Sequence, residues 1–175
     1  MVFLKRYIYL IFLYFLLNNQ VIANVDINTF VSPWYTKCLA ADKKSNQICT
    51  MQRTMFANKE QTIQIASLVL ETSIQRRYAR FSLISPLGAF IPHGVRISLD
   101  NQVIAKIPFG YCESNGCYST VDVKDDVIEK FKKSKFLILD YLNKDQKSIT
   151  VKIPMDEFED SYNKIRQSSK HKLII

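Results

Sequence analysis

Apolar side chains recur at every second residue through much of this chain, and this alternation constrains its fold more than any other feature. The clearest runs are 63–65, 95–99 and 149–153, where Ile, Val and Leu alternate with polar residues. A period of two places one face of a strand in a core and the other in water. Many short strands at this spacing predict a mainly β fold, an antiparallel β-sandwich or a barrel-like domain. Further strand candidates are 34–39, 48–56, 68–72, 80–84, 103–111, 118–123 and 136–142.

Two dipeptides predict tight turns between these strands. Asp100-Asn101 separates two alternating runs. Asn115-Gly116 is a favoured hairpin dipeptide, because both residues tolerate positive φ. We therefore expect hairpins at both places.

Two segments have helical rather than strand periodicity. Asp125–Lys133 places apolar residues on one side and lysines toward its end, where they complement the helix dipole. Near the C-terminus, Asp156 and Glu159 resemble a capping box. An apolar stripe at helical spacing starts at Phe158, and it predicts a second short helix packed on the sandwich.

The first residues have the order of a secretory signal peptide. A short positive segment precedes the apolar run 7–17, and small or branched residues lead to a cleavage point between Ala23 and Asn24. The alternative is an N-terminal membrane anchor, but a run of that length spans only about 16 Å of helix against a hydrocarbon core of roughly 30 Å. We therefore expect a signal peptide at 1–23 and a single domain at 24–175 with no transmembrane span. Such a domain is periplasmic, on the outer surface or secreted.

Export bears directly on the four cysteines, Cys38, Cys49, Cys112 and Cys117. An even number of cysteines in a chain sent out of the reducing cytoplasm indicates disulfides. Four cysteines allow three connectivities. The local pairing Cys38–Cys49 and Cys112–Cys117 is favoured, because a hairpin at Asn115-Gly116 can bring the second pair together. A redox centre and a four-thiolate zinc site are the alternatives, but neither pair has the Cys-x-x-Cys spacing and export disfavours zinc.

Candidate catalytic residues are few. The two histidines are His93, in a Pro-His-Gly turn, and His171, in a basic tail. Neither has a metal-ligand spacing, and no nucleophile-elbow motif is present. A histidine oriented by a spatially neighbouring carboxylate would still support catalysis. We expect a non-enzymatic protein without cofactor or metal, with an enzyme that uses His93 as the alternative.

The chain is basic, with a formal charge of +8 that falls to +6 when Lys5 and Arg6 are removed (8 − 2). This charge either favours anionic lipid headgroups, lipopolysaccharide or acidic glycans as partners, or serves only solubility. Residues 76–81 mix basic and aromatic side chains, as nucleic-acid and glycan binders do. A solvated strand face explains them, and export argues against nucleic acid. The densest positive run, 130–135, complements the end of a helix.

The middle of the chain carries motifs that resemble a known family. They are Pro86-Leu87-Gly88, then Ile91-Pro92-His93-Gly94-Val95 in a strand that ends at Asp100, then Pro108-Phe109 with Cys112 and Gly116-Cys117. They resemble the invasion-associated locus B family of bacterial exported proteins. Trp34, Cys38, Cys49 and Gln52 look like its N-terminal part. One departure is Glu157, where the family usually has Gly in the turn into the last helix.

The resemblance implies an exported, disulfide-bonded, mainly β protein linked in some pathogens to entry into host cells, and it carries over no catalytic residue. We expect a protein that supports host-cell interaction or invasion, with a host-cell surface or a bacterial envelope component as its partner. The alternative is a periplasmic structural or stress-related envelope protein without host contact. At Glu157 we expect a different backbone shape, because glycine adopts conformations that glutamate disfavours.

Overall fold

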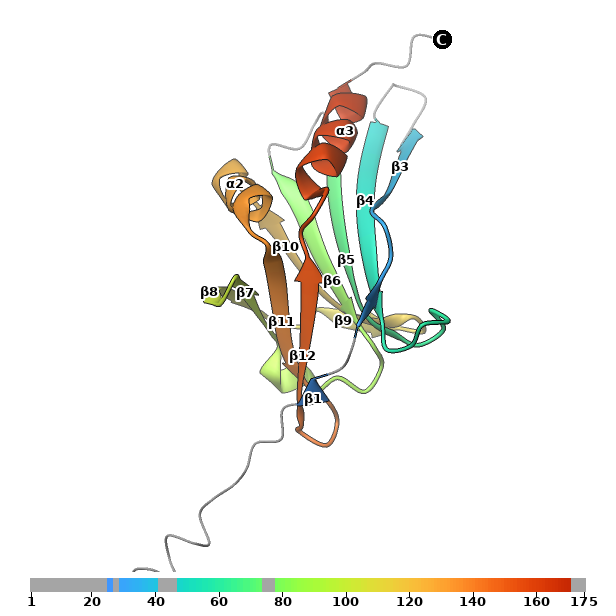
Figure 1. Cartoon of the computed structure of the whole chain (residues 1–175), viewed down its shortest axis with the longest axis vertical. Coiled ribbons are helices and arrows are strands. Elements are labelled where there is room, and N and C mark those ends of the chain that lie inside the picture. The colour runs from blue at the N-terminus through green and yellow to red at the C-terminus, as the bar shows by residue number, and fades with distance from the viewer. Residues whose placement is uncertain (1–24, 27–28, 41–46, 74–77, 171–175) are drawn as a thin grey trace, which may run out of the picture.

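Two sheets face each other in a β-sandwich in the computed structural model, which describes residues 25–26, 29–40, 47–73 and 78–170 (Figure 1). The smaller sheet has five strands, in the order β1 (Val25–Asp26), β12 (Ser148–Pro154), β11 (Phe136–Leu142), β7 (Val95–Leu99) and β8 (Gln102–Ile107). The larger has seven, β2 (Phe30–Val31), β4 (Gln47–Phe56), β5 (Gln64–Ser73), β6 (Ala79–Ser85), β10 (Gly116–Val123) and β9 (Tyr111–Glu113), with β3 (Tyr35–Ala40) also beside β4.

Neighbouring strands are antiparallel, except that β1 lies parallel to β12. The predicted sandwich is confirmed, and the described strands do not close into a barrel. The signal peptide and its cleavage point between Ala23 and Asn24 lie outside the described residues.

Strand boundaries differ from the expectation in two places. The separate candidates 63–65 and 68–72 merge into one strand, β5, which begins at Gln64 and leaves Ile63 outside it. The single candidate 103–111 is split into β8 and β9, because Pro108 has no N–H to continue a ladder. The short strands β1 and β2 and a 3₁₀ turn, η1 (Ile91–His93), have no counterpart in the expected pattern.

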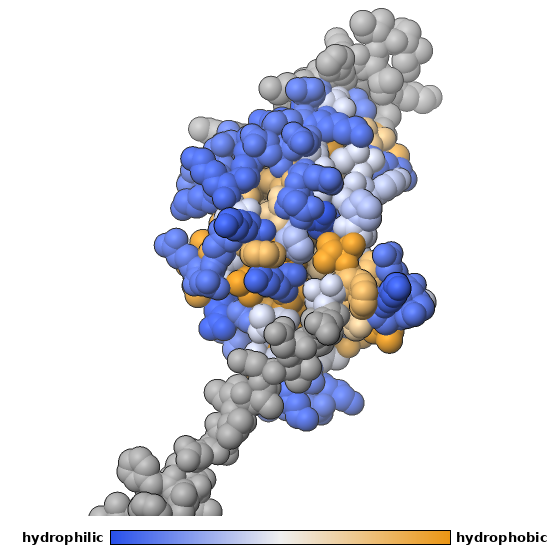
Figure 2. All heavy atoms as spheres, viewed as in Figure 1, coloured by the Kyte–Doolittle hydropathy of each residue, from blue (hydrophilic) through white to orange (hydrophobic). Residues whose placement is uncertain are grey.

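The core lies between the sheets and is formed by the inward residues of each alternating run. Met51, Leu70, Phe81, Leu137 and Val151 are each fully buried. Figure 2 shows a largely hydrophilic surface over the helical end of the molecule, with apolar patches lower down over the strands. Alternation therefore identified most of the core, although Ile63, in the run 63–65, is 58% exposed.

Two helices close the upper end of the sandwich, as the sequence predicts. α2 (Asp125–Lys133) has the expected bounds, and α3 (Phe158–Lys170) packs against β3, β4 and β5 (Figure 1). Phe158 is fully buried and lies edge-on to both Trp34 and Phe131, with ring centroids 5.5 and 5.8 Å away. This aromatic cluster joins both helices to the N-terminal part of the large sheet.

The expected capping box at the start of α3 is wrong. Asp156 lies outside the helix, and both its carboxylate oxygens accept hydrogen bonds from Arg53. At Glu157, where we expected a changed backbone, φ is 58°, in the left-handed region that glycine adopts readily. The carbonyl of Glu157 accepts the N–H of Ser161, so the turn into the helix keeps its shape with glutamate in it.

One hairpin turn is found where it was expected and the other is shifted. Asp100 and Asn101 both have positive φ and connect β7 to β8. In the β9–β10 hairpin the two turn residues are Ser114 and Asn115, because Gly116 already pairs with Glu113 in the ladder.

Candidate functional site

The two disulfides tie down opposite edges of the same sheet. Cys38 in β3 is bonded to Cys49 in β4, and Cys112 in β9 is bonded to Cys117 in β10. In each case the two cysteines are direct partners in an antiparallel ladder, with Cα atoms 4.0 Å apart. This is the local pairing favoured from the sequence. Because no cysteine is free, the four-thiolate zinc site is excluded.

Edge strands present unpaired backbone groups and fray more readily than inner strands. A covalent link to the inner neighbour therefore holds each edge of the seven-stranded sheet in register. The five-stranded sheet has no such link at its edge strands β1 and β8.

The Cys112–Cys117 hairpin displays a rigid, exposed aromatic surface. Tyr111 is 54% exposed, and its ring stacks on that of Tyr118 with centroids 4.8 Å apart. Asn115 donates a hydrogen bond to the Tyr118 hydroxyl at 2.6 Å. A tyrosine fixed in this way offers contact area at little entropic cost on binding, as the tyrosines of binding surfaces do.

A glycine lets this hairpin approach the neighbouring strand closely. Gly116 has φ of 144°, and a Cβ there would lie 2.4 Å from the carbonyl oxygen of Ser85 in β6. Ser85 is the residue paired with Cys117. The disulfide therefore links β9 to β10, and the absence of a side chain at Gly116 allows the hairpin to lie close to β6.

A buried arginine, Arg53 in β4, joins the other side of the large sheet to the segment between β12 and α3. The Arg53 side chain is 5% exposed, and its guanidinium donates to the carbonyls of Ser32 and Pro154 and to both carboxylate oxygens of Asp156. It also lies 4.9 Å from the centre of the Trp34 ring, whose N–H donates to the carbonyl of Asp156. The hydrogen bond from Arg53 holds the pKa of the Asp156 carboxyl below its usual range.

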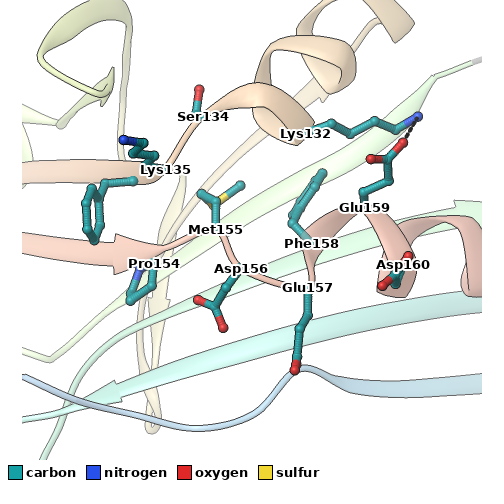
Figure 3. Close-up of a pocket in the computed structure, with 11 residues that line it drawn as sticks. Lys132, Ser134, Lys135, Pro154, Met155, Asp156, Glu157, Phe158, Glu159 and Asp160 are labelled. Carbon is teal, nitrogen blue, oxygen red and sulfur yellow. Dashed lines mark ion pairs between the residues drawn. The ribbon is translucent and has the colours of Figure 1, made fainter.

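A polar cavity of about 610 Å³ opens beside these contacts, between the end of α2 and the turn into α3 (Figure 3). Figure 3 shows Lys132 reaching across it to Glu159, 3.8 Å away. Lys132 also donates to Glu129 at 2.7 Å, and this bond raises the pKa of the lysine. The pair with Glu129 lies within α2, whereas the pair with Glu159 joins α2 to α3, so the cavity is a junction between helices.

His93 is the candidate catalytic histidine, and its surroundings are occupied by structural contacts. It lines a cavity of about 500 Å³ with Arg96, Asp140 and Ser148. The Asp140 carboxylate already accepts hydrogen bonds from Arg96 and Thr150. Within the described residues, no hydrogen bond joins the His93 side chain to Asp140 or Ser148, so the chain of contacts that orients a catalytic histidine is not formed. His171 lies outside the described residues.

Of the remaining charged candidates, the stretch 76–81 is described only in part. Arg80 pairs with Asp122 at 3.2 Å on the outer face of the large sheet, as a solvated strand face requires, and residues 76–77 lie outside the described part. The described residues hold no cluster of three potential metal ligands. They also include no helix with the length and apolar character needed to cross a bilayer.

The disulfide-bonded sandwich matches a known protein family. The family model described as invasion associated locus B (IalB) protein matches residues 34–166, a range that includes both disulfides and Arg53. The chain belongs to the IalB family. The resemblance seen in its motifs is thereby confirmed, and family membership together with two disulfides indicates a protein of a non-cytoplasmic, oxidising compartment.

A solved structure supports the IalB fold. The crystal structure of invasion associated protein B from Bartonella henselae matches with a TM-score of 0.67 at 15% sequence identity, over 81% of this chain and 99% of the other. At that identity the likeness concerns the fold alone. No curated protein matches the chain.

Sequence reasoning missed the main anchor of this IalB-family structure, Arg53. A signal was present, since Met51, Arg53 and Met55 share one face of a strand whose other inward residues are apolar. A charged residue on a core-facing position requires a buried partner.

Proposed function

We propose that this protein is exported by its signal peptide and supports interaction of a bacterium with host cells by binding, without catalysis. The observation that carries the proposal is the stapled hairpin at the edge of the large sheet, where Tyr111 is exposed yet held by the stack on Tyr118 and by the Cys112–Cys117 bond. A rigid, solvent-facing aromatic on a disulfide-bonded edge is suited to protein recognition.

Two further observations support binding rather than catalysis. The Asp140 carboxylate, which lines the same cavity as the candidate His93, accepts hydrogen bonds from Arg96 and Thr150. The structural relative is described as an invasion associated protein, which is a link to host entry rather than to a reaction.

The location is tested by protease treatment of intact bacteria, with a known periplasmic protein as control. We expect this protein to be digested while the control survives. Survival of both until the outer membrane is opened would place the protein in the periplasm, and the alternative role in the envelope would then replace host contact.

The contact surface is tested with two matched tyrosine variants. Tyr111 and Tyr35 are both exposed, at 54% and 64%, on the two disulfide-bonded edge strands β9 and β3. We expect Tyr111→Ser to reduce binding of the purified protein to cultured animal cells by about tenfold or more, the effect of losing an interface anchor, and Tyr35→Ser to leave it unchanged. Equal binding by both variants would remove the hairpin from the proposal.

A further inference from the structure

The sandwich leaves an apolar groove uncovered along one side, between β8 of the small sheet and β10 of the large one. Its volume is about 460 Å³, within the range of small-molecule sites. α2 bounds one end of it, at the side of the molecule where Figure 1 shows β7 and β8. Its apolar lining includes Phe81, Ile97, Ile104, Ile107, Val121 and Phe131.

The groove exists because the two sheets do not cover each other at this edge. Val121 lies on the inward face of β10, two residues from buried Val123 and Ser119, yet it is 37% exposed. Opposite it, the β7–β8 ladder shifts register between Ile97 and Ser98, which leaves Ile104 without a ladder partner. A bulge of this kind redirects a side chain, and here Ile104 lines the groove.

Three lysines lie beside the apolar lining of the groove. Lys106, Lys124 and Lys130 line the groove, are exposed, and form no ion pair within the described residues. The carboxylate among the lining residues, Asp122, is paired with Arg80 on the outer face. The groove therefore presents these three lysines to a ligand, whereas the charge of its carboxylate is already balanced by Arg80.

A second, polar recess of about 370 Å³ continues the groove, since Ile104 and Lys130 line both. Lys133 adds a second cation to it. Asp100 also lines the recess, but its carboxylate accepts the backbone N–H groups of Lys135 and Phe136. An apolar channel thus leads into a lysine-lined polar end.

We infer that this groove binds an anionic single-chain amphiphile, with the acyl chain between β8 and β10 and the anionic head near Lys130 and Lys133. Charge complementarity selects the anion, and the apolar lining beside a separate polar recess selects a molecule with one tail and one head. The shared chemistry is that of a long-chain carboxylate or an anionic lysophospholipid.

The test uses the full-length mature protein with both disulfides and the fluorescent probe dansyl-undecanoate. We expect enhanced, blue-shifted probe emission that laurate or lysophosphatidylglycerol reverses, the stronger competitor identifying the source of the chain. Val121→Asp, within the groove, is expected to abolish the enhancement. Val103→Asp is the matched control, because Val103 is exposed on β8, the other strand that bounds the groove, and lies outside the lining.

Charge variants keep the test independent of any folding defect. Lys130→Gln with Lys133→Gln is expected to weaken laurate by about tenfold relative to uncharged dodecanol, the effect of removing two exposed charges. Lys144→Gln with Lys147→Gln makes the same charge change in the β11–β12 loop and is expected to leave the preference intact. The inference fails if the probe does not bind, if both valine variants act alike, or if the two lysine pairs do.

Discussion

Glu157 holds a left-handed backbone with φ of 58° directly before α3. This conformation costs an L-residue with a side chain about 1 kcal/mol, whereas glycine adopts it freely. We expect Glu157→Gly to raise the free energy of unfolding by about 0.5–1 kcal/mol in urea denaturation. Lys164→Gly, at an exposed position inside α3, is expected to lower it by about 1 kcal/mol. Destabilisation by both variants would show that the Glu157 side chain contributes more than its backbone costs.

Asp156 gives the protein a pH-dependent component of stability. Its pKa is lowered in the folded state by the hydrogen bond from Arg53, so its contribution is complete above the unfolded value and is lost as pH falls through the folded one. We expect Asp156→Asn to destabilise the protein by about 1–2 kcal/mol at neutral pH, and the difference from the natural protein to shrink as pH falls below the ordinary value of 3.8.

The matched control for this titration is Asp145→Asn in the exposed β11–β12 loop, which is expected to change stability little at any pH. A difference between Asp156→Asn and the natural protein that stays constant down to acid pH would mean that the carboxylate charge is not what Arg53 requires.

For a single residue, the sequence predicts whether its side chain is buried better than it predicts which residues that side chain contacts. The inward position of Arg53 in the Met51–Met55 alternation signals a buried charge, but its contacts with Ser32, Pro154 and Asp156 come from segments distant along the chain. Asp156 and Glu159 have capping-box spacing, yet the Asp156 carboxylate accepts two hydrogen bonds from Arg53 instead of capping the helix. Local patterns cannot anticipate such competition.

The β9–β10 hairpin is the element whose geometry depends most on one residue. At Gly116 an added Cβ would meet the Ser85 carbonyl at 2.4 Å, and φ is 144°, so side chain and backbone both oppose a substitution. We expect Gly116→Ala to lower the free energy of unfolding by about 2–3 kcal/mol. Gly110, in the same segment, has open space, with its nearest atom 3.7 Å away.

Gly110→Ala is therefore the control and is expected to change stability by less than about 1 kcal/mol, measured in the same denaturation series. Similar losses from both alanine variants would mean that the hairpin relaxes away from β6 and that the close approach at Gly116 is not essential.

Across the whole molecule, one buried hydroxyl joins the two sheets. Tyr141 in β11 is 4% exposed and donates to the carbonyl of Ile65 in β5 at 3.1 Å. Ile65 lies where the β4–β5 ladder shifts register, since Met55 pairs with Ala66 and Phe56 with Gln64. The register shift in the large sheet thus leaves the Ile65 carbonyl available to accept the hydrogen bond from Tyr141 of the small sheet.

Burial raises the pKa of Tyr141 to about 12, so the folded state keeps the proton while the unfolded chain loses it above pH 10.0. Stability therefore falls between these two values. We expect Tyr141→Phe to cost about 1–2 kcal/mol at neutral pH and the gap to the natural protein to close as pH rises through this range. Tyr35→Phe, on an exposed strand, is the control. A gap that persists in alkali would rule out this titration.

The fold class follows from periodicity alone, because burial on one face imposes the period of two wherever a strand forms. Sheet membership does not, since β8 and β10 have similar patterns but belong to different sheets. The uncovered groove between them depends on the relative extents of the two sheets, and no local window of the sequence contains that information. The Cys112–Cys117 bond was predictable, because the two cysteines and the turn signal Asn115-Gly116 lie in the same short segment.

Both covalent bonds connect cysteines that are consecutive along the chain, the first with the second and the third with the fourth. Oxidation in the order of synthesis therefore produces the native connectivity. In that order Cys38 pairs with Cys49 before Cys112 becomes available, so no later exchange between pairs is required. We therefore expect an oxidising catalyst to mature this protein without an isomerase.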